Sequence, residues 1–339
     1  MRLSVALLAS LLGLAAPAAA DEPAAWLKRM AQAARTLDYH GTLVYAQGQS
    51  LESLRIAHRA APEGERERIE FLTGEPREIV RDGNRVACLL PRQHTLLDAA
   101  DGEHPLSLAR LADQTTLAPY YQVQAEAEDR VAGRQARIIG VQPKDGLRYG
   151  YRLWLDAEHG LLLRSALLGE DGQILEQMMF TSLSIGSPPG LKALSAEGVP
   201  AVSAIATDLD GEGLARATAG KPAQVTKLRA VPGSSVGAPA YRAQRLPPGF
   251  ALVSSSSRQV EQGQHSLHRL VYSDGLATIS VYVEPAAETG QLLHGTARRG
   301  GVQAFGASLG AIHVTALGEV PPATVEMVAR SVVSTQPPR

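Results

Sequence analysis

Short stretches in which apolar and polar residues alternate, separated by turns that contain glycine, recur along most of this chain. Residues 37–58 read LDYHGTLVYAQGQSLESLRIAH, and apolar side chains occupy alternate positions there, as they do in half-buried strands. In the segment EIVRDGNRVACLL, Asp82-Gly83 separates two apolar runs and predicts a β-hairpin. Spacers this short join neighbouring antiparallel strands, so the pattern predicts a mainly antiparallel β protein.

Helical spacing is confined to a few segments. Apolar residues repeat at helical intervals just after Pro23, and similar spacing recurs over residues 106–119 and 324–332. Strand-like runs over residues 120–185 are separated by turn signals such as Asp171-Gly172. We therefore expect an α+β fold that is mainly antiparallel sheet, with short helices interrupting the strands.

Residues 1–20 have the layout of an export signal. Arg2 supplies a positive charge, residues 3–14 form a mainly apolar core, and three alanines at 18–20 form a small-residue cleavage site. The apolar run is shorter than the roughly 20 residues that a membrane-spanning helix needs. We therefore expect an exported, soluble mature protein. No cysteine follows the cleavage site, so no lipid anchor is expected there.

Composition argues against two kinds of function. The formal net charge is −1, and the chain has four Phe and two Trp, so neither a basic surface nor a stacking platform for nucleic acid is expected. Cys88 is the single cysteine and cannot form an internal disulfide. We favour an inert core thiol at this position over a redox sensor or an intermolecular bridge.

The length and a change in composition predict two domains. Without residues 1–20, about 319 of the 339 residues remain, which is long for one core. Residues 187–240 are rich in Pro, Gly, Ala and Ser, which favours a connector. The predicted organisation is a signal peptide at 1–20, an N-terminal domain at 21–186, the connector, and a smaller C-terminal domain at 241–335. In the second domain, Ser273-Asp274-Gly275 is expected to join two strands.

Two motifs suggest chemistry that their surroundings do not support. The segment GASLG places Ser308 in the G-x-S-x-G pattern of serine hydrolases, but a strand is expected after it where the elbow requires a helix. The segment DLDGEG beginning at Asp208 resembles a calcium loop, but Ala219 occupies the position of the bidentate Glu. We therefore expect no catalytic residue, no metal ligand and no cofactor.

Two arginine pairs are candidates for binding an anion or a partner. Arg77 and Arg81 are four residues apart, so a strand places them on one face, where they could hold a carboxylate or a lipid phosphate. Arg298 and Arg299 precede two glycines at an expected turn, where the backbone could approach an anion. For the first pair, the alternative is solvation together with pairing to neighbouring glutamates.

Several segments together resemble a known family. The stretches YHGTLVYAQG, LESLRIAH, ERIEFLTGEPREIVRDG, VYSDGLATISVYVEP and VTALGEVPPATV are similar to the MucB/RseB family of periplasmic regulators of the envelope-stress sigma factor. The resemblance covers nearly the whole mature chain, with both parts in the family's order. The connector and the extreme C-terminus contribute little to it.

The resemblance implies a fold and a function. The N-terminal domain would be an unclosed barrel with covering helices, similar to the lipoprotein carriers LolA and LolB. The protein would bind the periplasmic segment of a transmembrane anti-sigma factor and shield it from the first regulated protease. Displaced lipopolysaccharide or another lipid would weaken that binding, and in some members the output is exopolysaccharide synthesis. The family supplies no catalytic residue.

Three hypotheses on function and two structural questions stay open. A lipid or lipoprotein carrier is the alternative to the regulator, and a hydrolase that uses Ser308 is the third hypothesis. An apolar face is expected to line a lipid-binding concavity, or else to form the core beneath the helices; its residues are Leu43, Tyr45, Leu54, Ile56 and Phe71. Strand register decides between these two outcomes. The oligomeric state is also open, a homo-oligomer included.

Overall fold

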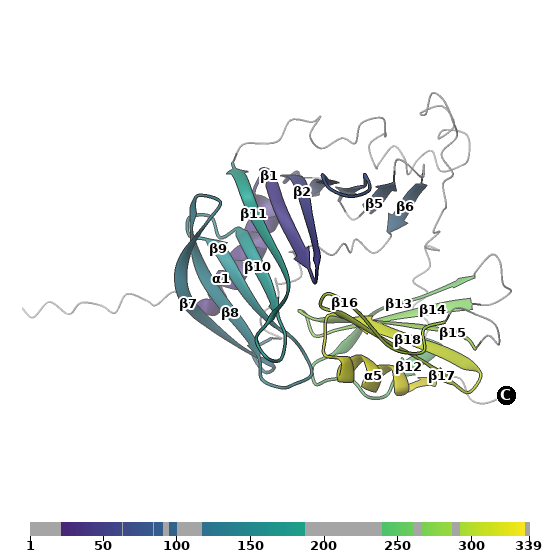
Figure 1. Ribbon diagram of the computed structural model, residues 1–339. Coiled ribbons are helices and arrows are strands. Elements are labelled where there is room, and N and C mark those ends of the chain that lie inside the picture. Colours follow the sequence, from purple (N-terminus) through teal and green to yellow (C-terminus); the bar gives the residue numbers. More distant parts are fainter. Residues whose placement is uncertain are drawn as a thin grey trace, which may run out of the picture.

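A large antiparallel sheet dominates the N-terminal part of the protein (Figure 1). The computed structural model describes residues 22–62, 64–83, 85–90, 95–99, 117–186, 239–259, 266–286 and 292–335. The strands of this sheet are β1 (Tyr39–Gln47), β2 (Ser50–Arg59), β3 (Arg66–Phe71), β4 (Glu78–Asp82), β5 (Arg85–Leu90), β6 (Thr95–Ala99), β7 (Tyr121–Val131), β8 (Arg134–Pro143), β9 (Gly150–Asp156), β10 (Leu162–Leu168) and β11 (Ile174–Ile185).

The large sheet consists of two runs of hairpins that β1 and β11 join. Its order is β6-β5-β4-β3-β2-β1-β11-β10-β9-β8-β7, so β6 and β7 are its edges and the sheet is not closed. The hairpin expected at Asp82-Gly83 is confirmed, because Asp82 pairs with Arg85. β7 also approaches β11, which shows that this half of the sheet curls. The predicted antiparallel, unclosed architecture is therefore confirmed.

One helix covers part of the large sheet. α1 (Pro23–Thr36) begins with Pro23, whose fixed φ suits the first helical turn. Trp26, Leu27 and Met30 are buried on one side of α1, and the helix packs on β7 and β8. The helix expected after Pro23 is therefore confirmed. Most of the segment expected to be helical at 106–119 lies outside the described residues, as do residues 187–238 of the expected connector.

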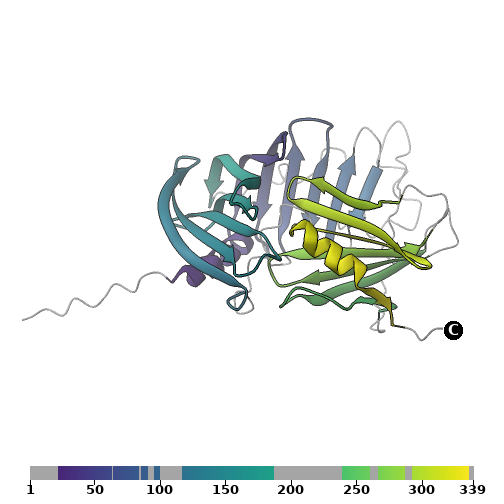
Figure 2. The ribbon, with the colours of Figure 1, turned by 60° about the horizontal axis from the view of Figure 1, so that its bottom comes forward.

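The C-terminal domain is a second antiparallel sheet with its own helix (Figure 2). Its elements are β12 (Tyr241–Ala243), β13 (Ala251–Gln259), β14 (Ser266–Ser273), β15 (Thr278–Pro285), β16 (Gly295–Arg299), β17 (Val302–Leu309), β18 (Ile312–Gly318), α5 (Pro322–Arg330) and β19 (Val332–Ser334). Six of the strands follow the order β13-β14-β15-β18-β17-β16, and β12 pairs with β19. α5 packs on β17 and β18.

The last helix differs from its prediction by a few residues. The sequence predicted a helix over 324–332, whereas α5 begins at Pro322 and ends at Arg330. Val332 instead pairs with Ala243 in the two-stranded sheet, so tertiary pairing takes this residue from the helix. Within the described part of the chain, no helix has the length and apolarity needed to cross a membrane.

Candidate functional site

The five residues predicted to bind lipid lie on one face of the large sheet. Leu43 pairs with Leu54 across β1 and β2, and Leu54 pairs with Phe71 across β2 and β3. Directly paired side chains project to the same side of an antiparallel sheet. Tyr45 and Ile56 lie two positions from Leu43 and Leu54, so they share that side. We call these five residues the apolar face.

The centre of the apolar face is filled by the protein's own side chains. Leu43, Leu54 and Ile56 are 2%, 0% and 6% exposed, in the same core cluster as side chains of α1. Tyr45 and Phe71 pack against this cluster and are only partly buried. A lipid that reached the centre would have to displace this packing. Lipid binding by these residues therefore stays a prediction.

Arg77 and Arg81 are near the apolar face but do not converge on one anion site. The Arg77 guanidinium lies 3.8 Å from the centroid of the Phe71 ring and 2.6 Å from Glu52. Arg81 is 3.4 Å from Glu65. Because an extended chain rises about 3.3 Å per residue, the Cα atoms of the two arginines lie about 13 Å apart. Each arginine therefore has its own glutamate, with which a lipid phosphate or a partner carboxylate would have to compete.

A buried histidine lies beside the Arg81–Glu65 pair. His58 stacks on Tyr39, with ring centroids 4.7 Å apart, and its Nδ1 lies 2.9 Å from the carbonyl oxygen of Leu37. Burial opposes protonation of His58, but Glu65 and Glu67 outweigh it and raise the pKa of this imidazole above its ordinary value. The imidazole Nε2 is 4.0 Å from Glu65. A positive charge on His58 is therefore favoured by the fold.

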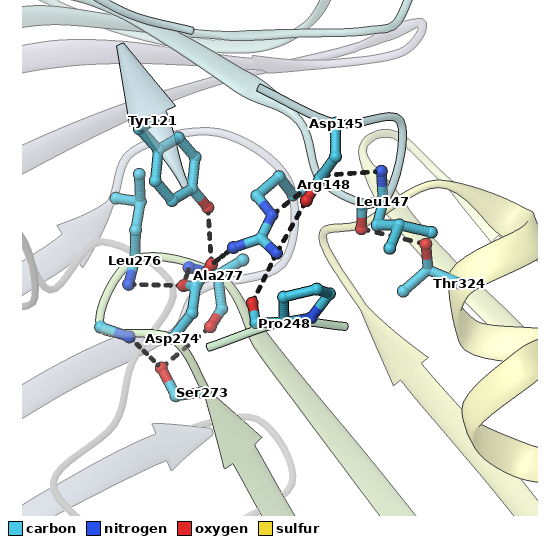
Figure 3. Close-up of polar contacts among 11 residues, drawn as sticks. Tyr121, Asp145, Leu147, Arg148, Pro248, Ser273, Asp274, Leu276, Ala277 and Thr324 are labelled. Carbon is cyan, nitrogen blue, oxygen red and sulfur yellow. Dashed lines mark hydrogen bonds and ion pairs between the residues drawn. The ribbon is translucent and has the colours of Figure 1, made fainter. Parts of the chain in front are cut away.

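The two domains meet at a buried ion pair (Figure 3). Arg148, in the loop between β8 and β9, lies 2.6 Å from Asp274 in the β14–β15 turn, and both side chains are fully buried. Tyr121 donates a 2.9 Å hydrogen bond to the same carboxylate oxygen, and Arg148 also donates to the carbonyl oxygen of Pro248 at 2.7 Å. Burial, and then the charge of Asp274, raise the pKa of Tyr121, so its hydroxyl remains a donor.

The turn that supplies Asp274 is shaped by the same carboxylate. Its other oxygen, Oδ1, accepts hydrogen bonds from the backbone N–H groups of Leu276 and Ala277, at 2.9 and 2.8 Å. Leu276 belongs to the core cluster of the large sheet although it lies in the C-terminal domain. One side chain thus both closes a turn and attaches it to the other domain. We call this group of contacts the Arg148–Asp274 junction.

A second contact between the domains centres on Glu176 of β11. Tyr45 and Gln47 of β1 donate hydrogen bonds to the Glu176 carboxylate at 2.5 and 2.7 Å, and the backbone N–H of Gly301 donates at 2.8 Å. Burial raises the pKa of the Tyr45 phenol most, and its hydrogen bond to Glu176 raises this pKa further. Further along, Tyr151 donates to Glu319 at 3.2 Å.

The predicted anion site at Arg298 and Arg299 lies beside this second contact. Both arginines are exposed in β16, an edge strand. The backbone of the following turn does approach an anion, since Gly301 binds the Glu176 carboxylate of the same chain. Binding of a partner by the two exposed arginine side chains stays a prediction.

The sequence matches two family models and several known proteins. The model described as MucB/RseB N-terminal domain matches residues 22–203, and the model described as MucB/RseB C-terminal domain matches residues 236–333. The chain belongs to the MucB/RseB family. The MucB/RseB N-terminal domain contains α1 and the whole large sheet, and the MucB/RseB C-terminal domain contains the smaller sheet with α5.

Relatives in this family match along nearly their whole length. The chain is 34% identical over 337 residues to the sigma factor AlgU regulatory protein MucB of Pseudomonas aeruginosa, covering 96% of this chain and 95% of the relative. It is 28% identical to the sigma-E factor regulatory protein RseB of Escherichia coli, covering 95% and 94%. A crystal structure of MucB in complex with MucA(peri) aligns with a TM-score of 0.68 and 31% identity, covering 93% of this chain and 100% of that one.

The hydrolase motif is not an elbow in this MucB/RseB protein. Ser308 lies in β17 and faces its cross-strand partner His313 in β18, with Oγ 3.3 Å from Nδ1. Burial lowers the pKa of His313. Among the described residues, the buried Nε2 of His313 has no hydrogen-bond partner, so no acid orients the ring. The relatives are named as regulatory proteins rather than enzymes.

Within the part of the chain that the structure describes, one cluster offers atoms that could bind a metal ion, but an arginine already binds there. Asp156, Glu158 and His159 bring three ligand atoms within 4.8 Å of one another. Arg134 lies 2.5 Å from Asp156. Burial raises the pKa of the Asp156 carboxyl group, but hydrogen bonds from Arg134 and His159 together outweigh burial and lower this pKa. We interpret the cluster as an ion-pair network between β8 and the β9–β10 turn.

Sequence reasoning did not find the residues that join the domains. Ser273-Asp274-Gly275 was predicted only as a turn, and Tyr121, Arg148 and Glu176 were not singled out. Arg148 lies in the segment KDGLRYG, where an arginine after a turn is ordinarily solvated. No local pattern distinguishes it from the chain's other arginines.

Proposed function

We propose that this chain is a periplasmic regulatory binding protein that binds the periplasmic segment of a transmembrane anti-sigma factor. The observation that carries the proposal is the alignment of both domains with MucB bound to MucA(peri), at a TM-score of 0.68 over the whole of that chain. Export through residues 1–20 and domain limits at 21–186 and 241–335 are parts of this proposal. An anti-sigma segment held against the protein would be shielded from regulated proteolysis.

Lipid sensing is the second part of the proposal. A lipid or lipopolysaccharide would bind the apolar face and weaken the complex, because a ligand shifts an equilibrium by its differential affinity for the two states. Tyr45 and Phe71 are partly buried and border the filled centre, so they are the first side chains that an acyl chain would meet. Arg77 lies over Phe71, where a phosphate could compete with Glu52.

The test is a cleavage assay of the anti-sigma periplasmic segment by its regulated protease. We expect this protein to slow cleavage, and added lipopolysaccharide to restore it. Ser308→Ala is the matched control, because it removes the hydroxyl of the hydrolase motif and leaves both domain contacts intact. Unchanged cleavage in the presence of the protein would contradict the proposal.

A lipid or lipoprotein carrier is the second candidate function. The apolar face of a curled, unclosed sheet favours it. A carrier would bind lipid but leave cleavage of the anti-sigma segment at its uninhibited rate. The same assay, combined with direct measurement of lipid binding, therefore separates the two functions.

A further inference from the structure

Glu176 accepts hydrogen bonds both from β1 of the large sheet and from the β16–β17 turn of the C-terminal domain. The Glu176 residue is 7% exposed. Its carboxylate accepts hydrogen bonds from the side chains of Tyr45 and Gln47 and from the backbone N–H of Gly301. All three donors are neutral. The contact between Arg148 and Asp274 adds attraction between opposite charges to its hydrogen bonds, so we expect the Glu176 contact to be the easier of the two to release.

Tyr45 belongs both to this contact and to the apolar face. Its ring packs against the core cluster that contains Leu43 and Leu54, while its hydroxyl lies 2.5 Å from Glu176. The ring cannot leave the cluster and keep its hydroxyl in place, because both belong to one rigid phenol. Any guest that displaces the ring therefore removes a donor from Glu176.

The β16–β17 turn packs closely against side chains of the large sheet. A Cβ atom added at Gly300 would overlap Gln47, and one added at Gly301 would overlap Leu167. The turn therefore sits directly against β1 and β10. Close-packed surfaces of this kind transmit a displacement instead of absorbing it.

We propose that Tyr45 and Glu176 couple the apolar face to the docking of the β16–β17 turn, with the Arg148–Asp274 junction as the fixed point. Displacing the Tyr45 ring weakens the hold on Gly301 and frees the turn, and with it the edge strand that carries Arg298 and Arg299. The role of a lipid as the displacing guest rests on the proposed function. The coupling itself is a property of the chain.

Hydrogen exchange of the Gly301 amide in the full mature protein tests the coupling. We expect Tyr45→Phe to speed this exchange about tenfold, since one hydrogen bond to the shared carboxylate is lost. Tyr151→Phe is the matched control: it also removes a tyrosine–carboxylate bond between the domains, but not one to Glu176. Unchanged exchange at Gly301 in Tyr45→Phe, or an equal rise in Tyr151→Phe, would overturn the coupling.

A second arm separates this coupling from lipid sensing. Lauroyl lysophosphatidylcholine, below its micelle-forming concentration, serves as a single-chain probe, and calorimetry measures its binding. We expect it to speed Gly301 exchange in the natural protein and to add little in Tyr45→Phe. Binding without any change at Gly301 overturns the coupling and leaves lipid binding in place. If the probe does not bind, lipid sensing fails and the tyrosine variants alone decide the coupling.

Discussion

At the scale of single residues, the charged groups at the domain junction matter most. Two unlike charges removed from water must compensate each other, and removing one partner of a buried pair costs about 3–5 kcal/mol. Exposed pairs contribute about 0–1 kcal/mol. The protein contains both kinds: Arg148–Asp274 is fully buried, whereas Arg330–Glu326 on α5 is exposed.

We expect Asp274→Asn to lower the free energy of unfolding by about 3 kcal/mol, because the buried Arg148 charge loses its fully buried carboxylate and keeps only the partly exposed Asp145, 3.1 Å away. Glu326→Gln is the matched control and is expected to cost less than about 1 kcal/mol. Urea unfolding of both variants measures the difference. Equal losses would show that the junction is not the special contact we describe.

His58 predicts a pH dependence with a definite sign. Because the fold raises its pKa, its stabilising contribution is complete below the unfolded pKa of about 6.5 and is lost as pH rises through the folded value. The difference in unfolding free energy between the natural protein and His58→Gln should therefore shrink from about pH 6 to about pH 8. His40→Gln, at an exposed position on β1, is the control. A difference that stays constant with pH would refute this prediction.

At the scale of elements, β2 shows how one strand serves two environments. Alternate side chains of a strand face opposite sides of the sheet. Leu54 is fully buried on the apolar face, whereas Leu51, three residues earlier on the other face, is 67% exposed. The two leucines therefore provide a comparison within one strand.

Truncating each leucine tests whether the apolar face is filled. We expect Leu54→Ala to cost about 2–5 kcal/mol of unfolding free energy through lost burial and a residual cavity. Leu51→Ala should cost less than about 0.5 kcal/mol, as exposed substitutions usually do. Chemical denaturation measures both. A small loss for Leu54→Ala would indicate an open concavity at that position.

At the scale of the whole molecule, polar contacts join two domains that each have their own hydrophobic core. The cores are separate clusters apart from Leu276, which the C-terminal domain contributes to the core of the large sheet. Unfolding of either domain would break the buried Arg148–Asp274 pair, which both domains supply. The domains are therefore expected to lose their structure together.

We expect calorimetry to show one unfolding transition for the natural protein and two for Arg148→Met. The substitution removes the Arg148 guanidinium and leaves in place the Tyr121 hydrogen bond and the hydrogen bonds inside the Asp274 turn. Arg330→Met, on the exposed face of α5, should keep a single transition. Two transitions in the natural protein would contradict tight coupling between the domains.

The sequence by itself determined the local structure and the family of this protein. Alternation, the Asp82-Gly83 and Ser273-Asp274-Gly275 turns, and the helix after Pro23 are short-range signals, and the structure confirms each. Only the tertiary structure decided which face of β1 and β2 is buried and which groups join the domains. Arg148 and Asp274 are 126 residues apart, and their contact depends on how two folded sheets dock. No spacing along the chain encodes that docking, because it is set by packing and by the need to give buried charged groups hydrogen-bond or ion-pair partners.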